Sequence, residues 1–188
     1  MFRKTVSLLL ALVLLCACLP ALALSGSKST KDMTQVVGGS VNTPAVVVQP
    51  QLTATAQGVL HDITAIVAAG GTAASYFAGK ATNPAGAPSF MGPTGDSTNA
   101  ELQLSELVSL GAYNLEGATG SFVSTIGFAT EYQAGQNVVV CLGYKGPDGS
   151  LIWTTLEVVV VGGMLQITFP VALLKEAGSD MVLAVLSN

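Results

Sequence analysis

This sequence of 188 residues has little charge, little histidine and little cysteine. Charged residues make up 10% of the chain, against about 25% in an average soluble domain. A disordered chain needs the opposite balance, low hydrophobicity with high charge, so global disorder is excluded. Nucleic acid is an unsuitable partner, because the seven Lys and Arg residues are scattered and form no basic run that would pair with phosphates.

A single histidine, His61, leaves most catalytic and metal-binding patterns unfilled. A zinc site needs about four Cys, His or acidic ligands, and a Ser-His-Asp triad needs a nucleophile turn that this chain lacks. We expect His61 to be a solvated helix residue. Cys141 is expected to be a small buried strand residue rather than a reactive thiol, since no Lys, Arg or His lies near it in the sequence. The sequence thus predicts no catalytic residues, no cofactor and no metal.

The first 23 residues have the pattern of a signal peptide. Arg3 and Lys4 form a positive start, an apolar run of ten residues follows at 6–15, and Pro20 precedes a small-x-small cleavage pattern that ends at Ala23. Ten apolar residues are too few to cross a bilayer of about 30 Å as a helix. We expect secretion with cleavage after Ala23. The alternative is a lipoprotein anchored through Cys18, because residues 15–18 are similar to a lipobox.

Cleavage after Ala23 would change the charge and the thiol content. Five lysines would then face eleven carboxylates, a net charge of −6, and only Cys141 would remain of three cysteines. A disulfide within one such chain is impossible, although export would permit one. Stability must therefore come from an apolar core, for which 165 residues suffice. No later apolar run reaches 18 residues, so we expect no membrane span after cleavage.

The segment 24–78 is predicted to hold a short strand and one amphipathic helix. The β-branched run Ala45–Gln49 is typical of a strand that Pro50 ends. Apolar residues recur at helical spacing over Leu52–Ala69, with Thr53 as a cap and two glycines as a stop. Gly58 weakens this helix by up to about 1 kcal/mol relative to Ala. A short helical turn is expected at Thr72–Phe77.

Residues 79–100 are rich in Gly, Pro and small polar residues. This composition predicts a loop that is long for a compact domain. Two interpretations stay open, a surface insertion without a role and a structured functional loop.

Residues 101–188 have the pattern of a β domain. Strands are expected at Leu102–Tyr113, Gly120–Thr130, Asn137–Tyr144, Leu151–Val161, Met164–Phe169 and Met181–Leu186, with a short helix at Pro170–Ala177. Tight turns join most of these strands. We therefore expect an α+β, mainly β fold: an immunoglobulin-like antiparallel β-sandwich preceded by a short strand and one amphipathic helix.

The Gly162-Gly163 turn predicts a register for the hairpin around it. A two-residue loop predicts four pairs along the hairpin: Val161 with Met164, Val160 with Leu165, Val158 with Ile167 and Leu156 with Phe169. One face is then almost wholly apolar, with Ile152, Leu156, Val158, Val160, Leu165, Ile167 and Phe169. Trp153 falls on the opposite face. We favour the interpretation that the Leu52–Ala69 helix covers it; an exposed binding platform and a place in the sandwich core are the alternatives.

Several short segments together resemble a family of small exported proteins from anaerobic Gram-positive gut bacteria. They are Ser29–Val36, the helix that ends in Gly70-Gly71 with Tyr76-Phe77 after it, Trp153–Glu157 before a Gly turn, Thr168–Pro170, Leu173-Leu174 and the closing Leu183–Ser187. The resemblance covers most of the chain after residue 23, and is strongest from Gly135 onward. It implies export but no activity and no functional residues. The turn at Gly162-Gly163 departs from the Asp-Gly of the family, and 79–99 does not fit its pattern.

These observations favour an exported, non-catalytic binding or structural module at or outside the cell surface. A cell-surface glycan or protein is the expected partner. Sugars stack on exposed aromatic rings, and the candidate ligand-binding residues are Trp153, Tyr144 and Tyr132, with Tyr113 as a further aromatic. The alternative is a secreted, glycosidase-like hydrolase that brings two of the scattered carboxylates to about 5–10 Å. A deep pocket with clustered acids would favour the enzyme, and a flat surface with Trp153 exposed would favour binding.

Overall fold

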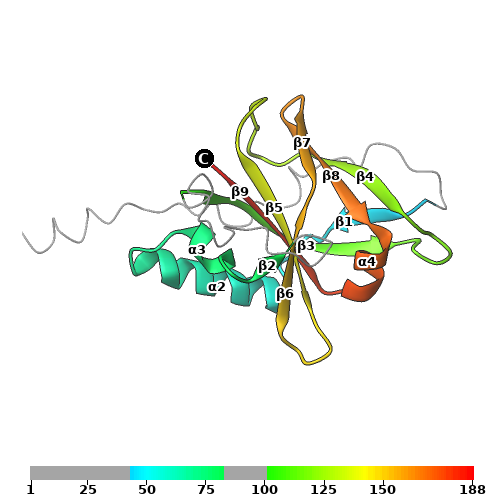
Figure 1. Ribbon diagram of the computed structural model, residues 1–188, viewed down its shortest axis with the longest axis horizontal. Helices are drawn as coiled ribbons and strands as arrows, with labels where there is room; N and C mark the ends of the chain where they lie inside the picture. Colours follow the sequence, from blue (N-terminus) through cyan, green and yellow to red (C-terminus); the bar gives the residue numbers. More distant parts are fainter. Residues whose placement is uncertain (1–42, 83–100) are drawn as a thin grey trace, which may run out of the picture.

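The computed structural model describes residues 43–82 and 101–188, which form a mainly β, α+β arrangement with two sheets (Figure 1). The larger sheet has six strands in the order β1-β3-β9-β5-β6-β2, and the smaller has three in the order β4-β8-β7. In chain order the elements are β1 (Ala45–Val48), α2 (Ala54–Ala68), α3 (Ala73–Phe77), β2 (Ala81–Thr82), β3 (Gln103–Tyr113), β4 (Ser121–Ile126), β5 (Val138–Lys145), β6 (Leu151–Leu156), β7 (Val158–Val161), β8 (Met164–Pro170), α4 (Val171–Ala177) and β9 (Met181–Ser187). The predicted class, mainly β with few helices, is confirmed.

The six-stranded sheet carries a separate apolar layer on each face. One layer lies between the two sheets and includes Leu142, Leu165, Ile167, Phe169 and Leu183. The other lies between the six-stranded sheet and the helices α2 and α3, and includes Ile63, Phe77, Trp153, Val182 and Leu186. The fold therefore has three layers: helices, six-stranded sheet and three-stranded sheet.

Strand β9 is covered on both faces of the sheet, and its sequence is apolar as a result. Six of its seven residues are apolar, all seven are buried, and its side chains alternate between the two layers. A strand covered on one face only would alternate apolar with polar residues, whereas a strand covered on both faces is apolar almost throughout. The strand predicted at Met181–Leu186 is confirmed, and its burial on both faces explains why the run is apolar throughout.

The chain moves from one sheet to the other at Glu157. Leu151–Val161, predicted as one strand, is two: β6 pairs with β5 in the larger sheet, and β7 pairs with β8 in the smaller. The predicted pairs Val161–Met164, Val160–Leu165 and Val158–Ile167 are confirmed. The predicted pair of Leu156 with Phe169 is wrong, because Leu156 lies in the larger sheet opposite Val140. Both side chains still line the layer between the sheets.

Helix α2 is anchored at its N-terminus by hydroxyl groups. Thr53 is the N-cap, as predicted, and its Oγ1 accepts a hydrogen bond from the Ala56 N–H. Ser109, buried in β3, donates its hydroxyl to Thr53 Oγ1 at 3.2 Å and accepts from the Thr53 N–H at 2.9 Å. These bonds fix the start of the helix against the sheet that it covers.

Two short strands extend the larger sheet beyond the predicted β domain. β1 pairs antiparallel with β3, so the strand predicted at Ala45–Gln49 is an edge strand of this sheet. β2 pairs parallel with β6 within the segment predicted to be loop, and this parallel pair departs from the expected all-antiparallel arrangement. Two residues carry too little pattern to predict a strand.

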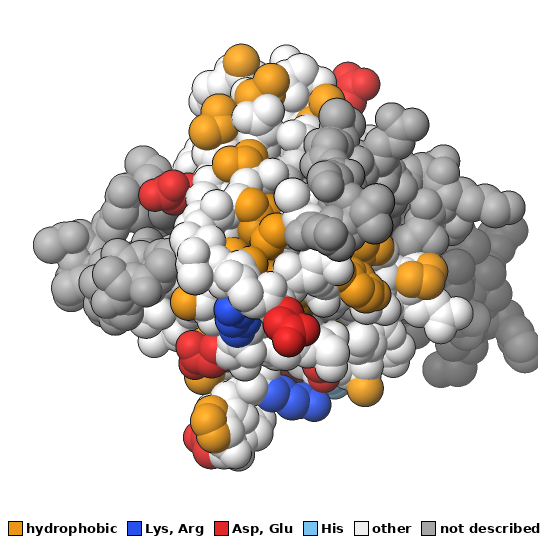
Figure 2. Space-filling model, turned by 90° about the vertical axis from the view of Figure 1, so that its right-hand side faces the viewer, with side chains coloured by type: hydrophobic (Ala, Val, Ile, Leu, Met, Phe, Trp, Pro, Cys, Tyr) orange, Lys and Arg blue, Asp and Glu red, His pale blue; other side chains and the backbone are white. Residues whose placement is uncertain are grey.

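The outer face of the three-stranded sheet exposes four large apolar side chains among polar ones such as Thr125, Gln166 and Thr168. Val123, Val159, Val161 and Met164 project from it with 36–61% of their surface exposed. In Figure 2, hydrophobic side chains run up the upper half of the face shown, and the Lys, Asp and Glu side chains gather mostly in its lower half.

Some predictions lie outside the described residues. They are the signal peptide at 1–23, Cys18, the segment 29–36 and the part of the loop at 83–100. In the part of the chain that the structure describes, no helix has the length and apolar character needed to cross a membrane.

Candidate functional site

The three aromatic residues predicted to bind a ligand are buried. Trp153 is 1% exposed, Tyr132 is 2% exposed and Tyr144 is 4% exposed, so none presents a ring face on which a sugar could stack. The structure does not bring them together either, since Trp153 lies in the helix-side layer and the two tyrosines lie between the sheets. Tyr113, the further aromatic considered, is 52% exposed.

Trp153 is covered from the helix side of the sheet, but the aromatic rings against it come from α3 and not from the Leu52–Ala69 helix that was expected to cover it. Its ring meets those of Phe77 and Tyr76 edge to face, with centroids 4.8 and 6.0 Å away. Its cross-strand neighbour is Gly143, and a Cβ at that position would lie only 2.7 Å from the indole ring. Glycine at 143 therefore makes room for the indole on the sheet.

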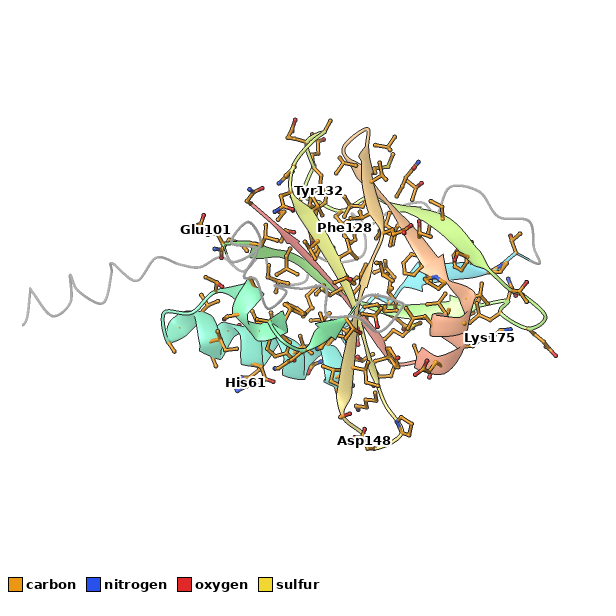
Figure 3. The ribbon with its side chains drawn as sticks, viewed as in Figure 1. His61, Glu101, Phe128, Tyr132, Asp148 and Lys175 are labelled. Carbon is orange, nitrogen blue, oxygen red and sulfur yellow. The ribbon has the colours of Figure 1, made fainter. Side chains whose placement is uncertain are left out.

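The two buried tyrosines hold structural hydrogen bonds. Tyr132 Oη lies 3.2 Å from the Ser105 hydroxyl, and burial raises its pKa to about 12 although this hydrogen bond opposes the rise. Tyr144 donates its hydroxyl to Glu176 at 3.1 Å, and burial together with this acidic partner raises its pKa. Figure 3 shows Tyr132 beside Phe128 at one end of the inter-sheet layer.

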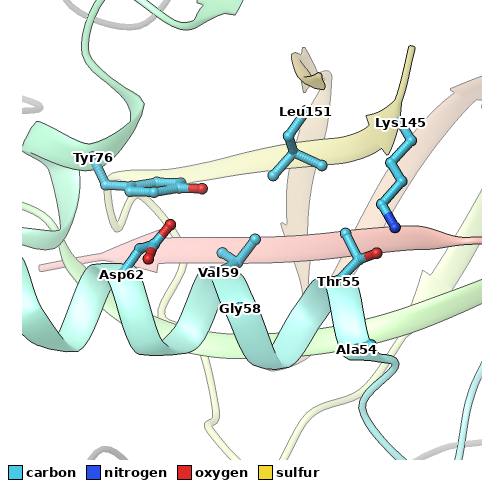
Figure 4. Close-up of a pocket in the computed structure, with 8 residues that line it drawn as sticks. All are labelled: Ala54, Thr55, Gly58, Val59, Asp62, Tyr76, Lys145 and Leu151. Atoms are coloured by element: carbon cyan, nitrogen blue, oxygen red, sulfur yellow. The ribbon is translucent and has the colours of Figure 1, made fainter. Parts of the chain in front are cut away.

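A groove of about 370 Å³ lies between α2 and the hairpin formed by β5 and β6 (Figure 4). Its residues come from α2, α3 and both strands of the hairpin: Ala54, Thr55, Gly58, Val59, Asp62, Tyr76, Lys145 and Leu151. Figure 4 shows Val59 and Leu151 in its middle, Tyr76 and Asp62 at one end, and Thr55 and Lys145 at the other. An apolar middle with a few polar groups at its ends is typical of a small-molecule site.

The Lys145 end of the groove is built around Asp180. Thr55 donates its hydroxyl to Asp180 Oδ2 at 2.6 Å, and Lys145 Nζ lies 3.6 Å from the same oxygen. Partial burial raises the pKa of Asp180, but the threonine hydroxyls and the Lys145 charge outweigh it and hold that pKa below its ordinary value. The Lys145 side chain remains 55% exposed, so its ammonium has donors left for a ligand.

The other end combines a phenol with a carboxylate. Tyr76 is 5% exposed, and Lys80 Nζ lies 4.0 Å from the centre of its ring. Burial raises the pKa of Tyr76; the nearby indole N–H of Trp153 lowers it, and the Asp62 charge raises it. That N–H makes no hydrogen bond of acceptable geometry among the described residues. Asp62 is exposed on α2.

Gly58 keeps the middle of the groove open. It is the fifth residue of α2, inside the helix, where glycine costs about 0.5–1 kcal/mol relative to alanine. A Cβ at this position would meet nothing within 4 Å, so no packing contact requires glycine. The missing side chain does leave space along the groove that Gly58 lines.

Other candidate chemistry lies away from the groove. Cys141 is fully buried, as predicted, and burial raises the pKa of its thiol. His61 is exposed, as predicted, and points away from the sheet in Figure 3. Across residues 43–82 and 101–188, no three His, Cys, Asp or Glu side chains form a group that could hold a metal ion.

Sequence reasoning missed the groove because its residues are up to 97 positions apart. The one local signal was Gly58, an unfavourable residue inside an otherwise regular helix. Comparison with protein-family models, with curated proteins and with solved structures finds no match to this chain.

Proposed function

We propose that this protein is an exported, non-catalytic binding module that acts at or outside the cell surface and takes a small ligand in the groove between α2 and the β5–β6 hairpin. The observation that carries the proposal is the groove itself, with its apolar middle and its polar groups at both ends. Its volume of about 370 Å³ falls in the range of about 300–1,000 Å³ usual for ligand sites.

The layered fold suits this role. The two sheets form the scaffold, for which we propose an immunoglobulin-like relationship, and the helices on the other side form one wall of the groove. A ligand bound there would contact α2, which is held by Thr53 and Ser109, and the β5–β6 hairpin, which is flanked by β9 and β2 in the six-stranded sheet. The site is thus placed on rigid elements, as specific binding requires.

Export is the second part of the proposal, and it rests on the charge, apolar run and cleavage pattern of residues 1–23. N-terminal sequencing or intact-mass measurement of protein from the culture medium should find a chain that begins at Leu24. A diacylglyceryl group on Cys18 would instead establish a membrane-anchored protein, and an uncleaved chain retained in the cytoplasm would contradict export.

Binding can be tested by ¹⁵N–¹H NMR with a library of small polar-apolar fragments. Bound fragments should shift the amide signals of Gly58, Val59 and Leu151. Gly58→Leu should abolish these shifts by filling the groove, and Ala68→Leu, which places the same side chain at an exposed helical position outside the groove, should leave them intact. Shifts confined to other surfaces, or unaffected by Gly58→Leu, would contradict the assignment of the groove.

A further inference from the structure

The length of the groove limits what can span it. Thr55 and Asp62 mark its two ends and lie seven residues apart on α2. At 1.5 Å per residue this spacing is about 10 Å along the helix. An extended peptide advances about 3.3–3.6 Å per residue, so a peptide of three residues matches this length.

The two ends differ in charge. Asp62 offers an exposed carboxylate, and no salt bridge to it is found in the described part of the chain. Lys145 offers an ammonium that is half exposed, and its contact with Asp180 occupies one side of it at 3.6 Å. An amine at the first end and a carboxylate at the second would complement both.

Asp180 does not turn the Lys145 end into an anionic site. Its Oδ2 accepts from Thr55 and contacts Lys145, and its Oδ1 is buried, so both oxygens are engaged or covered although the side chain as a whole is 40% exposed. A ligand carboxylate would therefore meet the outer side of the ammonium, which can donate up to three hydrogen bonds.

The middle of the groove favours small apolar side chains. Gly58, Val59 and Leu151 line it, and none of these residues offers a side-chain hydrogen-bonding group. Tyr76 presents its phenol at the edge of this apolar stretch (Figure 4), where the hydroxyl can hydrogen-bond a backbone group of an occupant.

We propose that the groove binds a short, extended apolar peptide of about three residues, with its free N-terminal ammonium at Asp62 and its C-terminal carboxylate at Lys145. This inference rests on the proposed function and names the ligand class of the same site. A free amino acid carries both charges too close together to reach both ends. A monoamine would leave Lys145 unused, and a monocarboxylate would face the Asp62 charge.

The test is an NMR titration of the purified protein with trialanine, N-acetyl-trialanine and trialanine amide. Each blocked terminus should weaken binding about two- to fivefold, the size expected of one partly exposed ion pair. Asp62→Asn should remove the penalty for acetylation and keep the penalty for amidation. Lys145→Gln should do the reverse, and both variants should keep the fold because both side chains are largely exposed.

The possible results separate this inference from the proposed function. If fragments shift the groove signals but trialanine does not, or if blocking a terminus changes nothing, the peptide is the wrong ligand class and the groove remains a binding site. If neither peptide nor fragment shifts Gly58, Val59 or Leu151, both proposals are wrong. If Asp62→Asn and Lys145→Gln each weaken the binding of all three peptides equally, the substitutions damage the groove as a whole. That result would overturn the assignment of the two ends.

Discussion

The two faces of the six-stranded sheet are covered in different ways. On one face the three-stranded sheet closes over a layer that is mostly aliphatic, with Leu142, Leu165 and Ile167 fully buried. On the other face α2 and α3 cover the sheet, Phe77 and Tyr76 of α3 contact Trp153 of β6, and a groove remains along α2. The comparison teaches that closure between sheets provides stability, while a helix laid over a sheet leaves an edge where a ligand can enter.

The inter-sheet layer should be the more sensitive of the two to truncation. Phe169 is fully buried there, stacked against Phe122 with ring centroids 5.8 Å apart. Phe169→Ala should lower the free energy of unfolding by about 3–5 kcal/mol, through lost burial and the cavity left behind. The urea midpoint measures this change. Val123→Ala, on the exposed face of the same sheet, should move the midpoint little, and equal effects of the two substitutions would show that the faces are assigned wrongly.

On the helix side, the contact of Trp153 with Gly143 should be the tightest point. Gly143→Ala places a methyl group 2.7 Å from the indole ring and should cost about 1–3 kcal/mol in unfolding free energy. In a Trp153→Leu background the same change should cost much less, because the ring is gone. A double-mutant cycle in urea measures this coupling, and additive effects would refute the contact.

Asp180 should link stability to pH at the start of α2. Its pKa is lowered by folding, so the stabilisation is present above the unfolded value of about 3.9 and is lost as the pH falls through the lower folded value. Asp180→Asn should cost about 1 kcal/mol at pH 7, a low figure because the side chain is 40% exposed and solvent screens it. Thermal unfolding from pH 7 to pH 2 measures both effects. If Asp180→Asn loses stability in acid as steeply as the parent protein does, Asp180 does not contribute to the pH dependence of stability.

Gly58→Ala should have the smallest effect on stability, and it should be favourable. Alanine removes the conformational cost of glycine in α2 and meets no neighbour, so the unfolding free energy should rise by about 0.5–1 kcal/mol. Ala65→Gly, at an exposed position of the same helix, should lose a similar amount. A fall in melting temperature for Gly58→Ala would show that glycine is needed for folding rather than for the groove.

Local sequence patterns predicted the helices and strands, but not which distant elements would cover the two apolar faces of a strand. The cap at Thr53, the turn at Gly162-Gly163 and the pairs around it follow from spacing and turn chemistry alone. The transfer between sheets at Glu157 left no local mark, because the run from Leu151 to Val161 has no proline or glycine to interrupt it. Neither strand nor helix patterns report which distant elements will meet.

The candidate site was less predictable than the fold for the same reason. Aromatic residues were the candidates for it, yet all three are buried: Trp153 lies under the helix side of the larger sheet, and Tyr144 and Tyr132 lie in the layer between the sheets. The groove depends on the docking of α2 and α3 beside the β5–β6 hairpin. No spacing rule within one segment describes such a contact.

The central claim is that Trp153, the only tryptophan, is covered from the helix side. Acrylamide quenching of its fluorescence in the intact protein tests this most directly, with Phe77→Leu as the helix-side variant and Ile167→Val as the inter-sheet control. We expect weak quenching in the parent, stronger quenching in Phe77→Leu, which removes a ring 4.8 Å from the indole, and no change in Ile167→Val. Ready quenching in the parent, or an increase only in Ile167→Val, would contradict it.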